Sequence, residues 1–399
     1  MGVFLDSVPV SGIMRIRDMM FDLTNPFRLD QGDVSFDVPD SVKQAMLGAI
    51  AGNQTHYLQT AGLPRLRELL AEKLRHRNGI PVGSPEDVLV TTGGIHGLFA
   101  LCQALLEPGD EVIVPDPEWP PCMGNIRLAH GVPVGCRVHE GLGWRWDLDE
   151  LESKITPRTK AIYINSPHNP TGGVLTRADI TTIAAIADRH GLWVISDEAY
   201  EDVIYDGGEH VSIASLPDVY PRSISLYTFS KSYAMTGLRL GYVVAKDAML
   251  LDRMKKALFY TASNIASVVQ WGGVGALEGP RTPVDEFRTE LQVRRDLFFA
   301  GVREAAGDVL TGAPPQGAFY GFLRLDPAWW DAHRGQTTET SPSWAFTEYL
   351  IRHAKIGCVP GLDFGPAGEG YIRFCYARSR QEIAGALDAM RALLAGARA

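Results

Sequence analysis

A lysine directly follows a candidate buried strand, in Thr228-Phe229-Ser230-Lys231. Burying a charged amine is unfavourable, but the penalty disappears when the amine forms an imine with an aldehyde cofactor. Thr228 and Ser230 bring hydroxyls to the same locality and Arg239 brings a guanidinium, a combination that is typical of a phosphate cup. Taken alone, the Ser-Lys pair favours the simpler interpretation of a solvated lysine in a loop of small polar residues.

A carboxylate ends another candidate strand, in Ser196-Asp197-Glu198-Ala199-Tyr200. Ligands of open parallel sheets bind at the carboxyl ends of the strands. A carboxylate there can pair with a pyridinium nitrogen and keep it protonated, so that the ring stores the electrons of a carbanion. Tyr200 is then placed to donate to a phenolate oxygen. The commoner use of such an aspartate is to cap a helix at a strand–helix junction.

Three further segments have the right residue types for the same site. The turn over 165–173 contains two X-Pro steps and two glycines, which fix a turn that could aim the Asn169 amide. Thr91-Thr92-Gly93-Gly94-Ile95 joins a strand to a helix, whose free N–H groups bind phosphate. Arg373 interrupts an apolar strand pattern, as an exposed residue or as a carboxylate clamp. Each segment alone is weak, and His168 is expected to be a surface or structural histidine.

These segments lie on alternating strand-like and helix-like stretches, and several of the strands are short and β-branched. Amphipathic stretches at 98–106 and 179–190 separate some of them. The alternation predicts an α/β fold with a mostly parallel sheet covered by helices. The expected strands are Val88–Thr91, Glu111–Val114, Val134–Val138, Ala161–Asn165, Trp193–Ser196, Ser223–Thr228 and Leu240–Val244.

The last third of the chain predicts a smaller α+β domain. Its expected elements are helices over 286–305 and 381–394 and strands over 319–325 and 371–376. We therefore expect an N-terminal segment (1–45) that joins the small domain, a large cofactor-binding domain (46–290) and a small C-terminal domain (291–399). The polar stretch Asp326–Ser343 is interpreted as a surface excursion of the small domain, with a mobile lid as the alternative.

Composition excludes several classes of protein. The 399 residues are 45% apolar and 21% charged, as in globular proteins, and the net charge of −9 argues against nucleic-acid or anionic-membrane partners. No stretch approaches the roughly 18 apolar residues of a membrane span, and the start does not resemble a secretory signal. Five scattered cysteines indicate reduced thiols and a cytoplasmic location. We assign no metal ligands.

In this order and spacing, the segments resemble the class I/II aminotransferases, pyridoxal-phosphate enzymes of fold type I, near the aspartate aminotransferase branch. The resemblance extends from Leu29-Asp30-Gln31-Gly32 to Arg373. It implies a large domain with a mostly parallel seven-stranded sheet and a smaller α+β domain. The signatures are Asn165–Gly173, Ser196–Tyr200, Phe229–Gly241, Gln316–Tyr320 and Val359–Gly365.

The resemblance implies a role for each catalytic residue. Lys231 matches the lysine that holds pyridoxal 5'-phosphate as an internal aldimine and then moves the substrate proton. Asp197 matches the partner of the pyridinium nitrogen. Tyr200 and Asn169 match the residues that hydrogen-bond the phenolate oxygen of the cofactor.

It also implies the binding residues. Trp119 matches the aromatic that stacks on the cofactor ring. Tyr57 resembles the tyrosine that reaches the phosphate of a neighbouring subunit, which implies a homodimer with shared active sites. Arg373 resembles the clamp for the substrate α-carboxylate, helped by Asn169 and the backbone of Gly32. The implied phosphate cup consists of Gly94, Ile95, Thr228, Ser230 and Arg239.

One departure bears on the substrate. Acid-specific bacterial relatives often carry a lysine where this chain has Ile95, and isoleucine cannot pair with a second carboxylate. With Trp119, Phe364 and Trp329, Ile95 would form a more apolar pocket. Another arginine could still bind a distal carboxylate, and glutamate or aspartate remains a candidate donor.

The expected activity is ping-pong transfer of an amino group between an L-amino acid and a 2-oxo acid, without strict specificity for aspartate. The alternatives are a pyridoxal-phosphate carbon–sulfur lyase or another specialised enzyme of the same fold, and a non-catalytic ligand-binding module. Such modules normally carry a basic DNA-binding appendage, which this sequence lacks.

Overall fold

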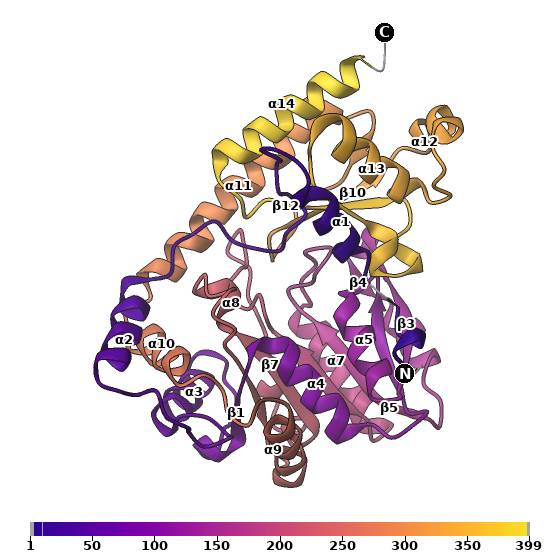
Figure 1. The fold of residues 1–399 in the computed structure, drawn as a ribbon. Helices are drawn as coiled ribbons and strands as arrows, with labels where there is room; N and C mark the ends of the chain where they lie inside the picture. The colour runs from indigo at the N-terminus through magenta and orange to yellow at the C-terminus, as the bar shows by residue number, and fades with distance from the viewer. Residues whose placement is uncertain (1–3, 10, 397–399) are drawn as a thin grey trace.

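Eight strands form the larger of two sheets in the computed structural model, which describes residues 4–9 and 11–396. They are β1 (Val88–Thr91), β2 (Glu111–Asp116), β3 (Val132–His139), β4 (Arg145–Trp146), β5 (Thr159–Asn165), β6 (Trp193–Asp197), β7 (Ser223–Thr228) and β8 (Gly241–Ala245). Their order is β1-β8-β7-β6-β5-β2-β3-β4 (Figure 1). The pairs from β7 to β3 are parallel, whereas β8 is antiparallel to both neighbours. The seven predicted strands are confirmed, and the two-residue β4 adds an antiparallel edge to β3.

Helices cover both faces of this sheet. They are α2 (Asp40–Ala51), α3 (Pro64–Arg77), α4 (Gly93–Leu105), α5 (Pro120–Leu128), α6 (Leu148–Ser153), α7 (Arg177–Arg189), α8 (Phe229–Ser232), α9 (Ala248–Ala262) and α10 (Ser267–Glu278). Helices α4, α5 and α9 pack on one face. On the other face, α3 and α10 cover the β1–β8 end, and α6 and α7 cover the β5–β3 end. Strands buried on both faces need such layers, which confirms the predicted α/β class.

A second sheet of four antiparallel strands follows, in the order β11-β12-β10-β9. The strands are β9 (Leu310–Thr311), β10 (Tyr320–Leu325), β11 (Val359–Pro360) and β12 (Tyr371–Cys375), and the helices are α11 (Thr282–Ala306), α12 (Pro327–His333), α13 (Pro342–Ala354) and α14 (Arg380–Gly396). Helix α11 runs along both parts of the molecule, with α14 beside its upper half (Figure 1). No helix in the described residues is long and apolar enough to cross a membrane.

Short 3-10 turns complete the structure. They are η1 (Phe4–Ser7), η2 (Pro85–Asp87), η3 (Glu140–Leu142), η4 (Ile213–Ser215), η5 (Tyr220–Arg222), η6 (Arg334–Gln336), η7 (Gly361–Phe364) and η8 (Pro366–Gly368).

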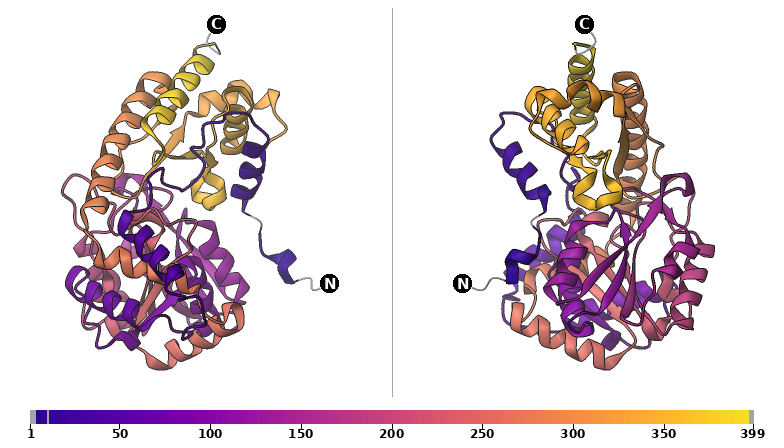
Figure 2. Two further views of the ribbon diagram at one scale, coloured as in Figure 1. Left: turned by 60° about the vertical axis from the view of Figure 1, so that its left-hand side comes forward. Right: turned by 90° about the vertical axis from the view of Figure 1, so that its right-hand side faces the viewer.

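Part of the N-terminal segment packs on the second sheet. Helix α1 (Gly12–Phe21) buries Ile16 and Met20 against Val359 and Phe364. Further along, the Cys375 N–H donates to the Leu29 carbonyl at 2.7 Å. Figure 2 shows α1 beside the C-terminal helices. The Phe4 ring lies 4.3 Å from the ring of His130, which follows α5.

Both predicted domain boundaries fall inside helices. Position 45/46 lies within α2, which packs on α10 beside the large sheet, and position 290/291 lies within α11. The chain therefore passes between the two parts along continuous helix at α11. The three-part division stays a prediction.

The polar stretch Asp326–Ser343 forms α12 and η6. Trp329 is buried, with its ring 4.8 Å from Phe346 and 5.5 Å from Tyr349 in the core of the small part. The expectation that Trp329 contributes to a substrate pocket is therefore wrong. Its apolar neighbours hold the excursion against the small part, whereas the lid alternative stays untested.

Candidate active site

A cavity of about 470 Å³ lies between the two sheets, where the parallel strands of the large sheet end. Asp197 is the last residue of β6 and Thr228 the last of β7, and α4 begins just after β1. All predicted site residues except Tyr57 and Phe364 line this cavity: Gly32, Gly94, Ile95, Trp119, Asn169, Asp197, Tyr200, Thr228, Ser230, Lys231, Arg239 and Arg373. The topology thus gathers residues that are up to about 340 positions apart, 373 − 32, into one site.

Lys231 is carried into the cavity by the single turn α8. Its Nζ donates to the Gly32 carbonyl at 2.6 Å. Burial, which disfavours the ammonium form, lowers the Lys231 pKa to about 8, and the nearby positive charges of Arg239 and Arg373 act in the same direction while Asp33 opposes them. An amine with this pKa is partly unprotonated near neutral pH, which a nucleophilic lysine requires.

Asp197 is a cavity-facing carboxylate that has hydrogen bonds but no ion pair among the described residues. The Ala199 N–H donates to Oδ1 and the Tyr163 hydroxyl donates to Oδ2, each at 3.0 Å. Burial raises the Asp197 pKa to about 6, and the negative charges of Glu118 and Glu198 add to the rise. The site therefore has an uncompensated negative charge above that pH, suited to a cationic partner in the cavity.

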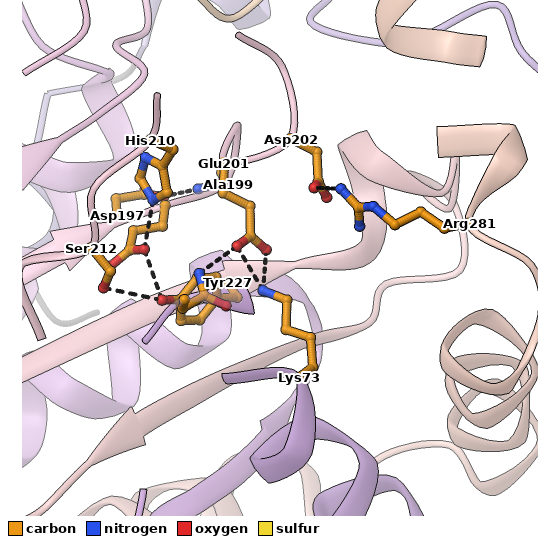
Figure 3. A network of polar contacts seen from close by, with 11 residues as sticks. Lys73, Asp197, Ala199, Glu201, Asp202, His210, Ser212, Tyr227 and Arg281 are labelled. Carbon is orange, nitrogen blue, oxygen red and sulfur yellow. Dashed lines mark hydrogen bonds and ion pairs between the residues drawn. The ribbon is translucent and has the colours of Figure 1, made fainter. Parts of the chain in front are cut away.

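The loop that follows Asp197 is fixed by carboxylates on its other side (Figure 3). Glu198 accepts hydrogen bonds from His210 at 2.8 Å and from the Tyr227 hydroxyl at 2.7 Å. Burial alone would raise the Glu198 pKa, but these bonds and the attraction of His210 outweigh it, so the pKa lies below its ordinary value. Glu201 bonds Lys73 Nζ at 2.5 and 2.6 Å.

Asp202 completes this set by pairing with Arg281 at the start of α11. Burial opposes ionisation of Asp202, but the attraction of Arg281 and Lys73 prevails and lowers its pKa. Together these ion pairs tie the loop that follows Asp197 and carries Tyr200 to α3 and α11.

Arg373 and Asn169 are joined directly. Arg373 Nη1 donates to Asn169 Oδ1 at 3.0 Å and Nη2 donates to the Asp30 carbonyl at 2.7 Å. The Arg373 Nε is buried and has no partner within the described residues, and each Nη keeps a second N–H, so the guanidinium still has donors for an added acceptor. With Oδ1 engaged, Asn169 has its Nδ2 donor available for the cavity.

Phe364 lies beneath Arg373 rather than in the cavity wall, which corrects its predicted role. Its ring is fully buried, and the guanidinium lies 4.9 Å from the ring centroid. Arg373 also lies 4.6 Å from the centroid of the Tyr320 ring. Cation–π contacts with the two rings help to hold the guanidinium in place.

A phosphate-sized cradle surrounds the start of α4. Gly93 has φ = +72°, and a Cβ there would lie 2.5 Å from Arg239 Nη2, so only glycine allows the guanidinium to approach the helix start. Thr228 Oγ1 donates to Ser230 Oγ at 2.8 Å and Arg239 Nη1 donates to the Thr236 carbonyl. Free N–H groups at Gly94 and Ile95, two hydroxyls and one arginine together suit a phosphate dianion.

Trp119 is positioned by a buried acid. Glu118 Oε1 accepts from the Trp119 N–H at 2.6 Å, and Oε2 lies 3.3 Å from His168 Nε2. His168 is buried and also bonds Thr171, so it is the structural rather than the surface histidine that the sequence left open.

Tyr57 is outside the cavity and 89% exposed. It lines a separate surface depression with His56 and Asn264. The single chain does not bring Tyr57 to the phosphate cradle, so its expected role stays a prediction.

Sequence reasoning missed several residues of the site. Tyr320 bonds the Tyr200 hydroxyl at 2.7 Å, and its signal was present in the quoted Gln316–Tyr320 turn. Tyr163 supports Asp197 from the middle of β5, where no local pattern distinguishes it from a core residue. Ile13 and Arg17 enter the cavity from α1, which the sequence did not predict as a helix.

Comparisons with known proteins agree with this geometry. The family model of aminotransferase class I and II matches residues 24–390. The chain is 37% identical to an aspartate aminotransferase of Pyrococcus abyssi over 98% of this chain and 97% of the relative. It is 35% identical to aromatic-amino-acid aminotransferase 2 of Thermococcus litoralis, with the same coverage. A solved aromatic aminotransferase from Pyrococcus horikoshii OT3 superposes with a TM-score of 0.86 at 36% identity, covering 96% of this chain and 99% of that one.

These matches confirm the predicted family, the fold type I architecture and the enzymatic class, and they favour a transaminase over a lyase or a non-catalytic module. The relatives' names span aspartate and aromatic amino acids. The chain belongs to the class I and II aminotransferases, and it is an aminotransferase.

Proposed function

We propose that this aminotransferase uses pyridoxal 5'-phosphate, bound in the described cavity, to move an amino group between an L-amino acid and a 2-oxo acid. The observation that carries the proposal is that one cavity holds both Lys231, whose pKa is lowered, and Asp197, a carboxylate without an ion-pair partner among the described residues. Such a pair suits an aldehyde at one end of a ring and a protonated ring nitrogen at the other.

Each part of the cofactor has matching residues. Lys231 would hold the aldehyde carbon, and Asp197 would hold the ring nitrogen. Trp119 would lie against the ring, while Tyr200 and Asn169 donate to its phenolate oxygen. The phosphate would be held by Gly94, Ile95, Thr228, Ser230 and Arg239.

When bound, the cofactor supplies an electrophilic aldehyde and a ring that delocalises the electron pair left at the substrate Cα. Arg373 binds the α-carboxylate of the substrate through its free Nε and its Nη groups, with Asn169 and the Gly32 backbone on the same side. Lys231, once its amine is free, would remove the Cα proton and hold it for return to the carbon of the cofactor's aldehyde group. Asp197 stays ionised beside the positive ring nitrogen throughout.

Two further features belong to the proposal. Tyr57, Phe259 and Tyr260 are exposed aromatic residues, which supports a homodimer in which Tyr57 reaches the partner's phosphate cradle. All five cysteines are buried free thiols, which supports a reducing compartment such as the cytoplasm.

The test is the absorbance spectrum of the protein loaded with pyridoxal phosphate, before and after excess L-glutamate without an oxo acid. We expect a visible band that bleaches as 2-oxoglutarate forms in a stoichiometric amount. A visible band that does not respond would reject glutamate as the donor and direct a screen of other amino acids. Absence of any band with the cofactor present would contradict the proposal.

A further inference from the structure

Four cationic side chains among the described residues line the cavity: Arg17, Lys231, Arg239 and Arg373. The proposed function assigns the last three to the aldehyde, the phosphate and the α-carboxylate. Arg17 has no such role. It enters the cavity from α1, together with Ile13, which lies one helical turn earlier on the same face.

The opposite face of α1 is held to the small part of the molecule. Arg15 pairs with Glu339 at 2.8 Å and with Glu348, and its guanidinium lies 4.4 Å from the Trp344 ring centroid. At the start of the helix, Gly12 lies so close to Asp363 and Trp344 that a side chain would overlap both. These contacts fix the rotation of α1 and thereby direct Ile13 and Arg17 toward the cavity.

Arg17 itself is weakly engaged. Its ionic contact within the described residues is with Asp18 Oδ1 at 3.7 Å, between adjacent, largely exposed side chains. Such a contact contributes little in water. Arg15, two residues earlier, is a structural arginine of the same helix, because it pairs with two carboxylates and contacts an aromatic ring.

We propose that Arg17 is the specificity residue for acidic substrates and binds the distal carboxylate of a dicarboxylic amino acid or 2-oxo acid; this rests on the proposed function. Arg373 takes the α-carboxylate of the same molecule. The side chains of Ile13, Ile95 and Trp119 line the space for the methylene carbons between them. The cationic group for a second carboxylate is thus supplied by α1 and not by the start of α4, where Ile95 is apolar.

The experiment compares charged substrates with neutral isosteres. The rate of cofactor bleaching is measured for L-glutamate against L-glutamine and for L-aspartate against L-asparagine, in the wild type, Arg17→Gln, Arg17→Lys and Asp18→Asn. We expect Arg17→Gln to lower kcat/KM for the acids by about tenfold to a hundredfold and to leave the amides within about twofold, since one charged hydrogen-bonded contact is lost. Arg17→Lys should recover most of the preference, and Asp18→Asn should not reduce it.

A binding measurement removes any dependence on turnover. Calorimetric titration of the loaded protein with glutarate and with butyrate should give tighter binding of glutarate in the wild type and nearly equal binding in Arg17→Gln. An unchanged acid-to-amide ratio and an unchanged glutarate preference in Arg17→Gln would overturn the inference. Failure of the proposed function would look different, because no amino acid would change the spectrum of the wild type.

Discussion

Two lysine–carboxylate sets lie on opposite sides of the loop that follows β6. On the side away from the cavity, Lys73 and Glu201 bond each other at 2.5 and 2.6 Å (Figure 3). On the cavity side, Lys231 bonds a backbone carbonyl and Asp197 bonds an amide and a hydroxyl, so neither has an ion-pair partner among the described residues. Asp197 and Glu201 are only four positions apart along the chain, yet Glu201 forms an ion pair with a lysine and Asp197 does not.

The difference indicates that the Lys73–Glu201 pair has a structural role, whereas Lys231 and Asp197 have a role in binding and catalysis. A buried pair that is complete holds α3 against the loop and leaves no group for a ligand. Burial of a lysine or a carboxylate without an ion-pair partner is unfavourable until a ligand supplies the opposite charge. The pKa values of Lys231 and Asp197 shift toward the neutral forms because of this burial. The comparison predicts that cavity-side variants affect the rate and far-side variants affect stability.

The largest effect is expected for Lys231→Ala. Loss of the amine removes both the group that holds the aldehyde and the base for the Cα proton, so kcat should fall by more than about 10⁴-fold. Steady-state assays with a coupled 2-oxo acid readout measure this, with circular dichroism as the folding control. Near-normal turnover in a folded Lys231→Ala protein would remove Lys231 from the site.

Asp197→Asn should follow, with kcat lowered by about 10²- to 10⁴-fold. The amide still accepts from the Ala199 N–H, but it cannot stabilise a positive ring nitrogen. Cofactor retention after gel filtration and kcat are measured together, since the account predicts a folded protein whose rate is lost. A rate within a few-fold of the wild type would show that Asp197 acts only as a loop cap.

Glu201→Gln is the matched far-side variant. It removes the hydrogen-bonded ion-pair partner of the buried Lys73, which should lower the free energy of unfolding by about 3 kcal/mol. The rate of the folded, cofactor-loaded protein should stay within a few-fold of the wild type. Chemical denaturation and kcat supply the two measurements, and a large loss of rate without loss of stability would contradict the division.

The smallest effect concerns the protein without cofactor. The Asp197 pKa is raised from about 4 when unfolded to about 6 when folded, so its burial is unfavourable only where it is ionised. Removing the charge in Asp197→Asn should therefore stabilise the cofactor-free protein by about 3 kcal/mol at pH 7. The gain should be fully present above pH 6 and vanish as the pH falls to 4. Thermal unfolding across this pH range would detect it, and a destabilised variant at pH 7 would contradict the raised pKa.

The sequence predicts most of the cavity side, because Lys231, Asp197 and Asn169 are local to strand ends and turns whose patterns are visible along the chain. It does not predict the far side, because Lys73 lies on α3, 128 positions before Glu201. Packing also decided cases that residue type left open. Phe364 packs against the Arg373 guanidinium and Trp329 packs in the small part, although the sequence suggests both aromatic residues as pocket walls.

Arg17 illustrates the same limit. Nothing in the sequence near Arg17 distinguishes it from Arg15. Only the placement of α1 shows that Arg15 forms ion pairs with the small part whereas Arg17 lines the cavity.

The most direct test asks whether the cofactor's ring nitrogen, the proposed partner of Asp197, is protonated. Nitrogen-15 NMR of the protein loaded with pyridoxal phosphate labelled at the ring nitrogen reports whether that nitrogen is protonated. The account predicts a protonated nitrogen from pH 6 to pH 9 in the wild type and in Glu201→Gln, and loss of the proton in Asp197→Asn. A wild-type nitrogen that is unprotonated at neutral pH, or one that stays protonated in Asp197→Asn, would contradict the claim that the open carboxylate of this cavity is completed by its cofactor.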